Sequence, residues 1–142
     1  MSPLRELIAE KADLTVTQFQ DRVSGTLDFS QTSLDSIEEL LGDAADFIDV
    51  MSDDTVDALV ELVGSYILEV AARAFEGTFF WHQQHDQPVF VTGEPDAHIA
   101  IITFDKVRGR LNGDEGDNIP FFYAGFASRA ASPAKGTQVL YV

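Results

Sequence analysis

Glu69 is the residue whose neighbours in the sequence could give it an acid–base or ligand-binding role. Tyr66 precedes it by three positions and Arg73 follows it by four, within a mostly apolar stretch. Residues at these spacings share one face of a helix, so the three side chains can meet. Burial would raise the pKa of the Glu69 carboxyl, and a Tyr or Arg partner would keep it ionised. Such a group can act as an acid, a base or a ligand anchor, but a structural Glu69–Arg73 ion pair is the interpretation we favour.

A small-ligand or hydrolase-like pocket would need further side chains beside this carboxyl group. Trp81 and His82 lie in the aromatic segment that follows the helix. The pocket hypothesis therefore includes Tyr66, Glu69, Arg73, Trp81 and His82. The sequence offers no evident nucleophile with its own base and a third orienting group. We therefore assign no catalytic residue, and an enzyme is the less favoured class.

Two imidazoles and a carboxylate lie within five residues, at His82, His85 and Asp86. A zinc site needs three or four ligands that converge, and the zinc-protease motif places a Glu directly after the first His on a helix. Here Gln83 follows His82, and the segment is a predicted turn between two strands. We expect a solvated hairpin tip, and we expect no metal and no other cofactor.

The strongest signal in the sequence is the uneven distribution of charge. The 142 residues include 24 acidic and 9 basic side chains, which gives a formal net charge of −15. The segment 23–72 holds twelve of the acids and no Lys or Arg, so it carries −12 and the rest of the chain carries −3. Such a surface repels nucleic-acid phosphates and anionic lipids, and it attracts a basic protein. We expect a basic protein partner and neither a nucleic acid nor a membrane; solubility is the alternative explanation of the acidity.

Acidic side chains lie opposite the apolar stripes of the two helices predicted in this segment. The expected interaction face comprises Asp35, Glu39, Asp46, Asp49, Asp57 and Glu61. Like charges four residues apart destabilise a helix by a few tenths of a kcal/mol, roughly, for each pair. A bound partner or a solubility requirement would account for that loss.

Periodicity and capping residues predict the elements that position these side chains. Ser2 and Pro3 begin a first helix that Gly25 ends, with a break expected in the β-branched run 14–17. Apolar spacing of three and four predicts helices over 34–51 and 53–76, the second being the central one, and Gly64 within it indicates close packing. Period and turn signals then predict, in order, strands at 78–82, 88–92 and 97–104, helical turns at 105–111, a helix at 119–129 and a strand at 136–142.

This order of elements is typical of one α+β domain over residues 1–142. The helical half, 1–76, is expected to pack on a small, mostly antiparallel sheet in the mixed half, 77–142, which also holds one or two short helices. The sequence has no cysteine, no apolar signal core at its start and no apolar run near the roughly 18 residues of a membrane span. A cytoplasmic location is therefore expected. Nothing in the sequence sets the oligomeric state.

Two short motifs resemble those of a small group of bacterial domains of unknown function. Leu27-Asp28-Phe29-Ser30, followed by Ser33-Leu34, is similar to the group's Leu-Asp-x-Ser-x-x-Ser-Leu helix start, and the segment 64–69 is similar to its Gly-x-Tyr-x-x-Glu helix. An aromatic strand with Trp follows in both. The resemblance spans about residues 27–105, and Leu68 departs from it where the group has Gly. It implies an α+β fold in which Tyr66, Glu69 and Trp81 lie together, and it implies no activity. We therefore expect a non-catalytic interaction module with an acidic helical face, the alternative being the pocket around Glu69.

Overall fold

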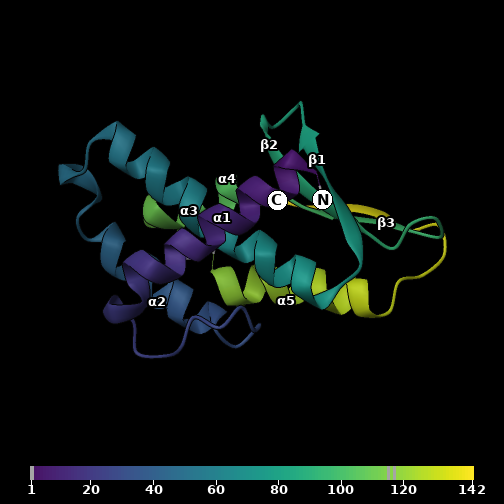
Figure 1. Cartoon of the computed structure of the whole chain (residues 1–142), viewed down its shortest axis with the longest axis horizontal. Helices are drawn as coiled ribbons and strands as arrows, with labels where there is room; N and C mark the ends of the chain where they lie inside the picture. Colours follow the sequence, from purple (N-terminus) through teal and green to yellow (C-terminus); the bar gives the residue numbers. More distant parts are fainter. Residues whose placement is uncertain (1, 115, 117) are drawn as a thin grey trace.

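The fold joins a helical N-terminal half to a four-stranded mixed sheet and two further helices (Figure 1). The computed structural model describes residues 2–114, 116 and 118–142. The first half contains α1 (Pro3–Phe19), the 3-10 turn η1 (Gln20–Arg22), α2 (Leu34–Ala45), the 3-10 turn η2 (Ile48–Val50) and α3 (Asp53–Ala74). The second half contains β1 (Gly77–His82), β2 (Gln87–Thr92), β3 (His98–Ile101), α4 (Phe104–Leu111), α5 (Ile119–Ala131) and β4 (Gln138–Tyr141). The predicted α+β class is confirmed.

The starts of α1 and α3 follow from their capping serines. Ser2 accepts a hydrogen bond from the Arg5 N–H, and Ser52 accepts one from the Thr55 N–H. The predicted break in the run 14–17 is wrong, because α1 continues to Phe19. The hydroxyl of Thr15 lies 2.9 Å from the Lys11 carbonyl oxygen and 2.7 Å from that of Leu62 on α3. This contact satisfies a buried polar group and holds a β-branched residue within the helix.

The four strands are ordered β1-β2-β3-β4. The first two pairs are antiparallel, with Phe79 opposite Phe90, and β4 then lies parallel to β3, with Val139 opposite Ile99. A parallel pair needs a long crossover connection, and the segment containing α4 and α5 supplies it. The sheet face that carries Phe79, Phe90 and Ile99 shares the main core with the helices.

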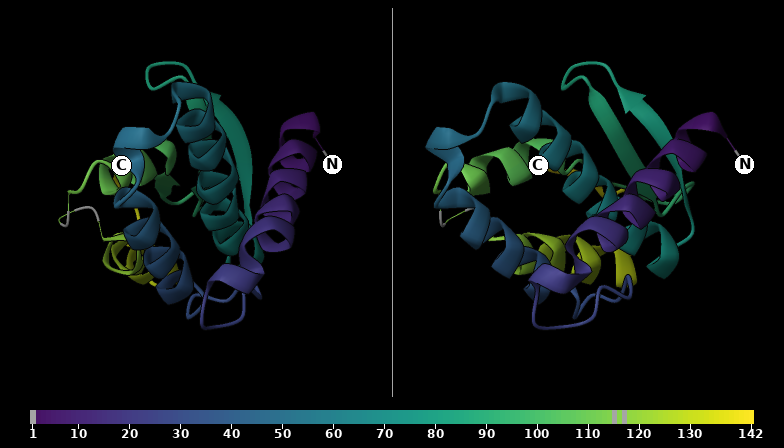
Figure 2. Two further views of the ribbon diagram at one scale, coloured as in Figure 1. Left: turned by 90° about the vertical axis from the view of Figure 1, so that its left-hand side faces the viewer. Right: turned by 60° about the vertical axis from the view of Figure 1, so that its left-hand side comes forward.

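The helices divide into two groups around the central helix α3. α1 packs along α3, and both also contact the β1–β2 hairpin (Figure 2). α2 instead makes its main helix contacts with α4 and α5. Leu34, Ile37 and Leu41 of α2 are completely buried there, and α3 is buried mainly between Leu59 and Ala71. This division leaves a hollow between α2 and the α1–α3 pair, described below.

Gly64 allows close packing of α3 against the start of α4, as the sequence indicates. A Cβ atom at this position would lie 2.4 Å from the ring of Phe104, and the Gly64 carbonyl oxygen accepts a hydrogen bond from the Thr103 hydroxyl at 2.8 Å. Gly42, in α2, offers a matched comparison because a Cβ there meets only the end of the Arg110 side chain, at 3.1 Å.

Gly64→Ala should therefore destabilise the protein, whereas Gly42→Ala should not. Overpacking at Gly64 is expected to lower the free energy of unfolding by about 1–3 kcal/mol, even though Ala favours a helix. At Gly42 the same change is expected to leave stability unchanged or to raise it by up to about 1 kcal/mol. Urea unfolding of both variants measures the difference. Equal effects at the two positions would contradict the assigned packing.

Candidate functional site

The carboxylate of Glu69 lies between two guanidinium groups. Glu69 is only 3% exposed, and both of its oxygens are hydrogen-bonded. Arg5 of α1 binds both oxygens: Nη1 donates to Oε1, and Nη2 donates to Oε2 at 3.1 Å. Arg73, one turn further along α3, donates from Nε to Oε2 at 2.8 Å. We call this set of three residues the Glu69 clamp.

The clamp keeps Glu69 ionised. Burial by itself would raise the pKa of the carboxyl, but the hydrogen bonds and positive charges of Arg5 and Arg73 outweigh burial and hold the pKa below its ordinary value. Both oxygens already accept hydrogen bonds, so the group is placed to hold charge rather than to exchange protons. The predicted Glu69–Arg73 pair is present, but the partner from α1 was not predicted.

Tyr66 anchors the chain that connects α1 to α2. Its ring is buried and stacks on Phe29 with 4.9 Å between ring centroids. The Tyr66 hydroxyl accepts a hydrogen bond from the Phe29 N–H at 2.9 Å and lies 2.7 Å from the hydroxyl oxygen of Ser33. These contacts hold Phe29 at φ 65°, a left-handed conformation that is rare without glycine. Arg73 covers the Phe29 ring, with its guanidinium carbon 3.9 Å from the ring centroid. The loop before α2 is therefore joined to the Glu69 clamp.

Ser33 lies at the start of α2 but does not cap the helix with its side chain. It occupies the N-cap position of α2, but its side chain accepts no capping hydrogen bond. Its hydroxyl donates instead to the Ser30 carbonyl oxygen at 2.6 Å and also contacts Tyr66. Burial is the main reason that the pKa of Tyr66 is raised. The Tyr66 hydroxyl therefore stays protonated and serves as a structural hydrogen-bonding group.

Trp81 and His82 lie apart from the other three residues of the predicted pocket. Trp81 is 51% exposed, and His82 accepts a hydrogen bond from the His85 N–H within the hairpin turn. Among the described residues, no hydrogen bond or ring contact joins either side chain to Tyr66 or to the clamp. The strand explains the separation, because β1 advances about 3.3 Å per residue. Arg5 contacts the ring of Phe79, and Trp81 lies two residues nearer the hairpin tip.

Metal ligands are not gathered in the part of the chain that the structure describes. No group of three or more His, Asp or Glu side chains there is placed to hold a metal ion. The rings of His82 and His85 are tilted by 58° with 4.9 Å between their centroids, and Nδ1 of His85 lies 3.2 Å from a carboxylate oxygen of Asp105. The hairpin side chains thus contact one another and the start of α4.

Several acids of the segment 23–72 pair with cations from elsewhere in the chain. Arg108 contacts Asp57 at 3.0 Å. Two further ion pairs join Arg110 to Glu38 at 2.5 Å and Lys11 to Glu61 at 3.4 Å. Two residues of the predicted interaction face, Asp57 and Glu61, are therefore partly neutralised. A third, Glu39, accepts two hydrogen bonds from Ser24, and Asp35, Asp46 and Asp49 have no ion pair among the described residues.

The unpaired acids concentrate where α2 leads into α3. We call residues 43–54 the acidic connection. It carries Asp43, Asp46, Asp49, Asp53 and Asp54, and none of them has an ion pair within the described part of the chain. Asp53 and Asp54 lie in the first turn of α3, where the helix dipole favours negative charge. Asp43 and Asp46, by contrast, lie at the C-terminus of α2, and the last turn of that helix has no basic residue.

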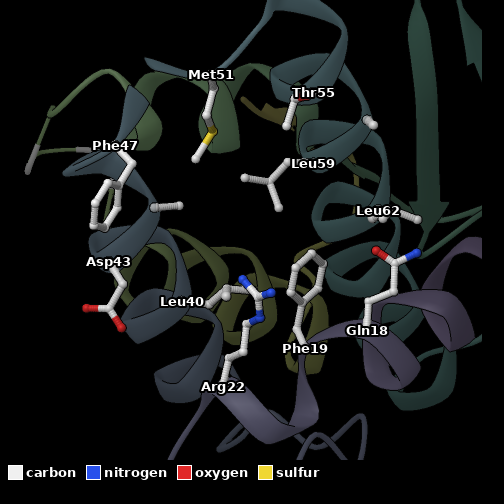
Figure 3. Close-up of a pocket in the computed structure, with 12 residues that line it drawn as sticks. Gln18, Phe19, Arg22, Leu40, Asp43, Phe47, Met51, Thr55, Leu59 and Leu62 are labelled. Atoms are coloured by element: carbon white, nitrogen blue, oxygen red, sulfur yellow. The ribbon is translucent and has the colours of Figure 1, made fainter. Parts of the chain in front are cut away.

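An apolar hollow of about 550 Å³ opens beside the acidic connection (Figure 3). Leu40 and Phe47 of the α2 side and Leu59 and Leu62 of α3 line it. The guanidinium of Arg22 points into it at the end nearest α1. The hollow was not among the features predicted from the sequence. The signal was present as spacing in the sequence: residues 40, 44 and 47 fall on one face of the helix predicted over 34–51, and residues 55, 58, 59 and 62 fall on one face of the helix predicted over 53–76.

Replacing Glu69 tests the clamp. Glu69→Gln leaves two cations without their carboxylate and should lower the free energy of unfolding by about 2–3 kcal/mol at pH 7. Glu61→Gln on the same helix is the matched control: its carboxylate is half exposed, and about 0–1 kcal/mol is expected.

The pH dependence of the Glu69→Gln loss follows from the lowered pKa. A carboxyl whose pKa is lower in the folded state stabilises the fold above its unfolded pKa of about 4.3, and that contribution disappears as the pH falls through the folded value. The difference between wild type and variant should therefore be full at neutral pH and shrink below about pH 4.5. Urea unfolding at several pH values measures it. A difference that persists unchanged at pH 2–3, roughly two units lower, would contradict an ionised clamp.

Comparison with protein-family models, with curated proteins and with solved structures finds no match to this chain. Within the described residues, every helix is too short or too polar to cross a membrane. The function of the site is therefore inferred from its geometry and its charges.

Proposed function

We propose that this protein is a non-catalytic binding module that presents the acidic connection to a basic macromolecular partner. One observation carries the proposal: five carboxylates lie within twelve consecutive residues, and none has an ion pair among the described residues. The cations that form ion pairs in the described part of the chain bind acids outside the acidic connection. Arg5 and Arg73 bind Glu69, while Lys11, Arg108 and Arg110 pair with Glu61, Asp57 and Glu38 on α3 and α2. A cytoplasmic location, which a cysteine-free chain suits, is part of the proposal.

The position of these acids supports a role beyond solubility. Negative charge at a helix C-terminus is unfavourable, by about 0.3–1 kcal/mol for each exposed group. Asp43 lies in the last turn of α2 and Asp46 at its C-cap, and Asp49 follows in the next turn. Acids placed for solubility alone could lie on any exposed helix face without this loss. A bound Lys or Arg would relieve the repulsion at the end of α2.

Removal of the same charges should stabilise the free protein. The triple variant Asp43→Asn, Asp46→Asn and Asp49→Asn is expected to raise the free energy of unfolding by up to about 1 kcal/mol at low salt. The gain should shrink as added salt screens the charges. Urea unfolding at two salt concentrations measures both effects. A less stable triple variant would contradict the view that the negative charges of these acids destabilise the free protein.

Capture from a host lysate, followed by titration, tests the binding itself. The wild type should retain a basic protein at low salt and release it at about 0.5 M salt, where screening acts over only a few ångströms. The triple variant should bind the captured, purified partner about tenfold more weakly. The matched control removes the same number of charges at exposed acids elsewhere, by Asp13→Asn, Asp86→Asn and Asp96→Asn. Retention of no basic protein, or equal losses in the two triple variants, would overturn the proposal.

A further inference from the structure

We infer that the apolar hollow beside the acidic connection receives one face of a basic amphipathic helix. The inference rests on the proposed function and names the form of the partner. An interaction helix of this kind presents apolar residues at spacings of three and four to a groove between helices. Its remaining surface carries the Lys and Arg side chains that meet the acids at the rim.

The walls of the hollow have the geometry of a helix-binding groove. Leu40 and Ala44 lie one turn apart on α2, Phe47 follows in the turn after it, and Ala58 and Leu62 lie one turn apart on α3. Rows of side chains at these spacings form ridges between which the side chains of another helix can pack. Because α2 packs mainly on α4 and α5, it does not close against α1, and the volume between the helices stays open (Figure 3).

The apolar surface continues outside the hollow. Phe47 is 62% exposed and Val50 is 82% exposed, on the connection that forms the upper rim. Leu14 of α1 is 42% exposed on the side that continues to Gln18, which lines the hollow. Exposed apolar side chains around one hollow are typical of a binding surface. A helix lying in the hollow would cover Phe47 together with the apolar floor.

The charges around the hollow determine the net charge of the helix that binds there and the direction in which the helix lies. Asp43 lines the hollow, and the other four acids lie on the acidic connection, whose Phe47 and Met51 also line it. Arg22 lies at the end of the hollow away from Met51 (Figure 3), and its side chain has no hydrogen bond or ion pair within the described residues. Acids outnumber this cation, so an anionic amphiphile is disfavoured and a basic helix is attracted. The positive N-terminal end of a docked helix should lie at the acidic connection, and its negative C-terminal end at Arg22.

Synthetic peptides test this inference independently of any natural partner. The probe is a fluorescein-labelled peptide of about 18 residues, or about 27 Å as a helix, with Leu at helical spacing and Lys on the other face. A peptide of the same composition in scrambled order has the charge but no apolar face. A third peptide has Glu in place of Lys. Fluorescence anisotropy measures the binding of each to the full chain.

Three substitutions separate the contribution of the hollow from that of the charge. Ala58→Trp fills the hollow from an exposed position on α3, and Ala124→Trp makes the same change at an exposed position of α5 that does not line it. Phe47→Ser, at an exposed side chain, is a second variant that removes apolar wall without adding bulk. Circular dichroism checks that each variant folds.

The amphipathic Lys peptide should bind about tenfold more tightly than the scrambled one, as expected when an apolar anchor enters a pocket. Ala58→Trp and Phe47→Ser should remove that difference, and Ala124→Trp should change it by less than about twofold. Equal binding of the two Lys peptides, unaffected by Ala58→Trp, would overturn the hollow as the site while the acidic proposal stands. Equal binding of the Glu peptide, or no binding of any peptide, would also overturn the inference, whereas the lysate capture decides the proposed function separately.

A nitroxide on the peptide tests the assigned direction. At the N-terminal end of the Lys peptide it should broaden the nuclear magnetic resonance signals of residues 46–50 more than those of residues 19–22. At the C-terminal end the order should reverse, because paramagnetic broadening falls steeply with distance. The opposite pattern would overturn the dipole argument for the direction of the helix.

Discussion

A buried carboxylate between two arginines is the interaction on which the arrangement of this fold depends. Glu69 joins α1 to α3 through Arg5, and each arginine also covers an aromatic ring, Phe79 on β1 or Phe29 in the loop before α2. The clamp therefore links four parts of the chain at one point. An uncompensated charge in this place would be strongly destabilising, so the three side chains must come together for α1 to dock. The docked α1 in turn forms one end of the apolar hollow.

The same long-range pairing explains where the negative surface remains. Cations of α1 and α4 reach the acids on the sides of α2 and α3, but none of them pairs with the acidic connection among the described residues. The acidic connection thus stays charged because the cations of α1 and α4 pair with other acids. Only part of the negative charge seen in the sequence is therefore unpaired. The apolar hollow lies directly beside the part that is unpaired.

Local signals predict the elements of this protein well, and tertiary contacts account for most of the differences. Capping residues and apolar periods placed most helices and strands within a few residues, but the helices expected to reach Gly25 and residue 51 end at Phe19 and Ala45. The break expected near Thr15 is wrong because its hydroxyl is satisfied by a carbonyl group of α3, 47 residues away. For the site, spacing could indicate the Glu69–Arg73 pair but not Arg5, which lies 64 residues from Glu69. Spacing also could not show that Trp81 lies towards the far end of β1, or that α2 would pack on the C-terminal helices and leave a hollow.

The packing of α2 has a consequence for how the chain acquires its structure. The apolar side of α2, with Leu34, Ile37 and Leu41, is covered mainly by α4 and α5, which are made some sixty or more residues later, roughly half the chain. Until those helices are synthesised, α2 has an apolar stripe with little to cover it. Native contacts of such high sequence separation slow folding, because a long loop must close before they form. We therefore expect α2 to gain its order together with the C-terminal half.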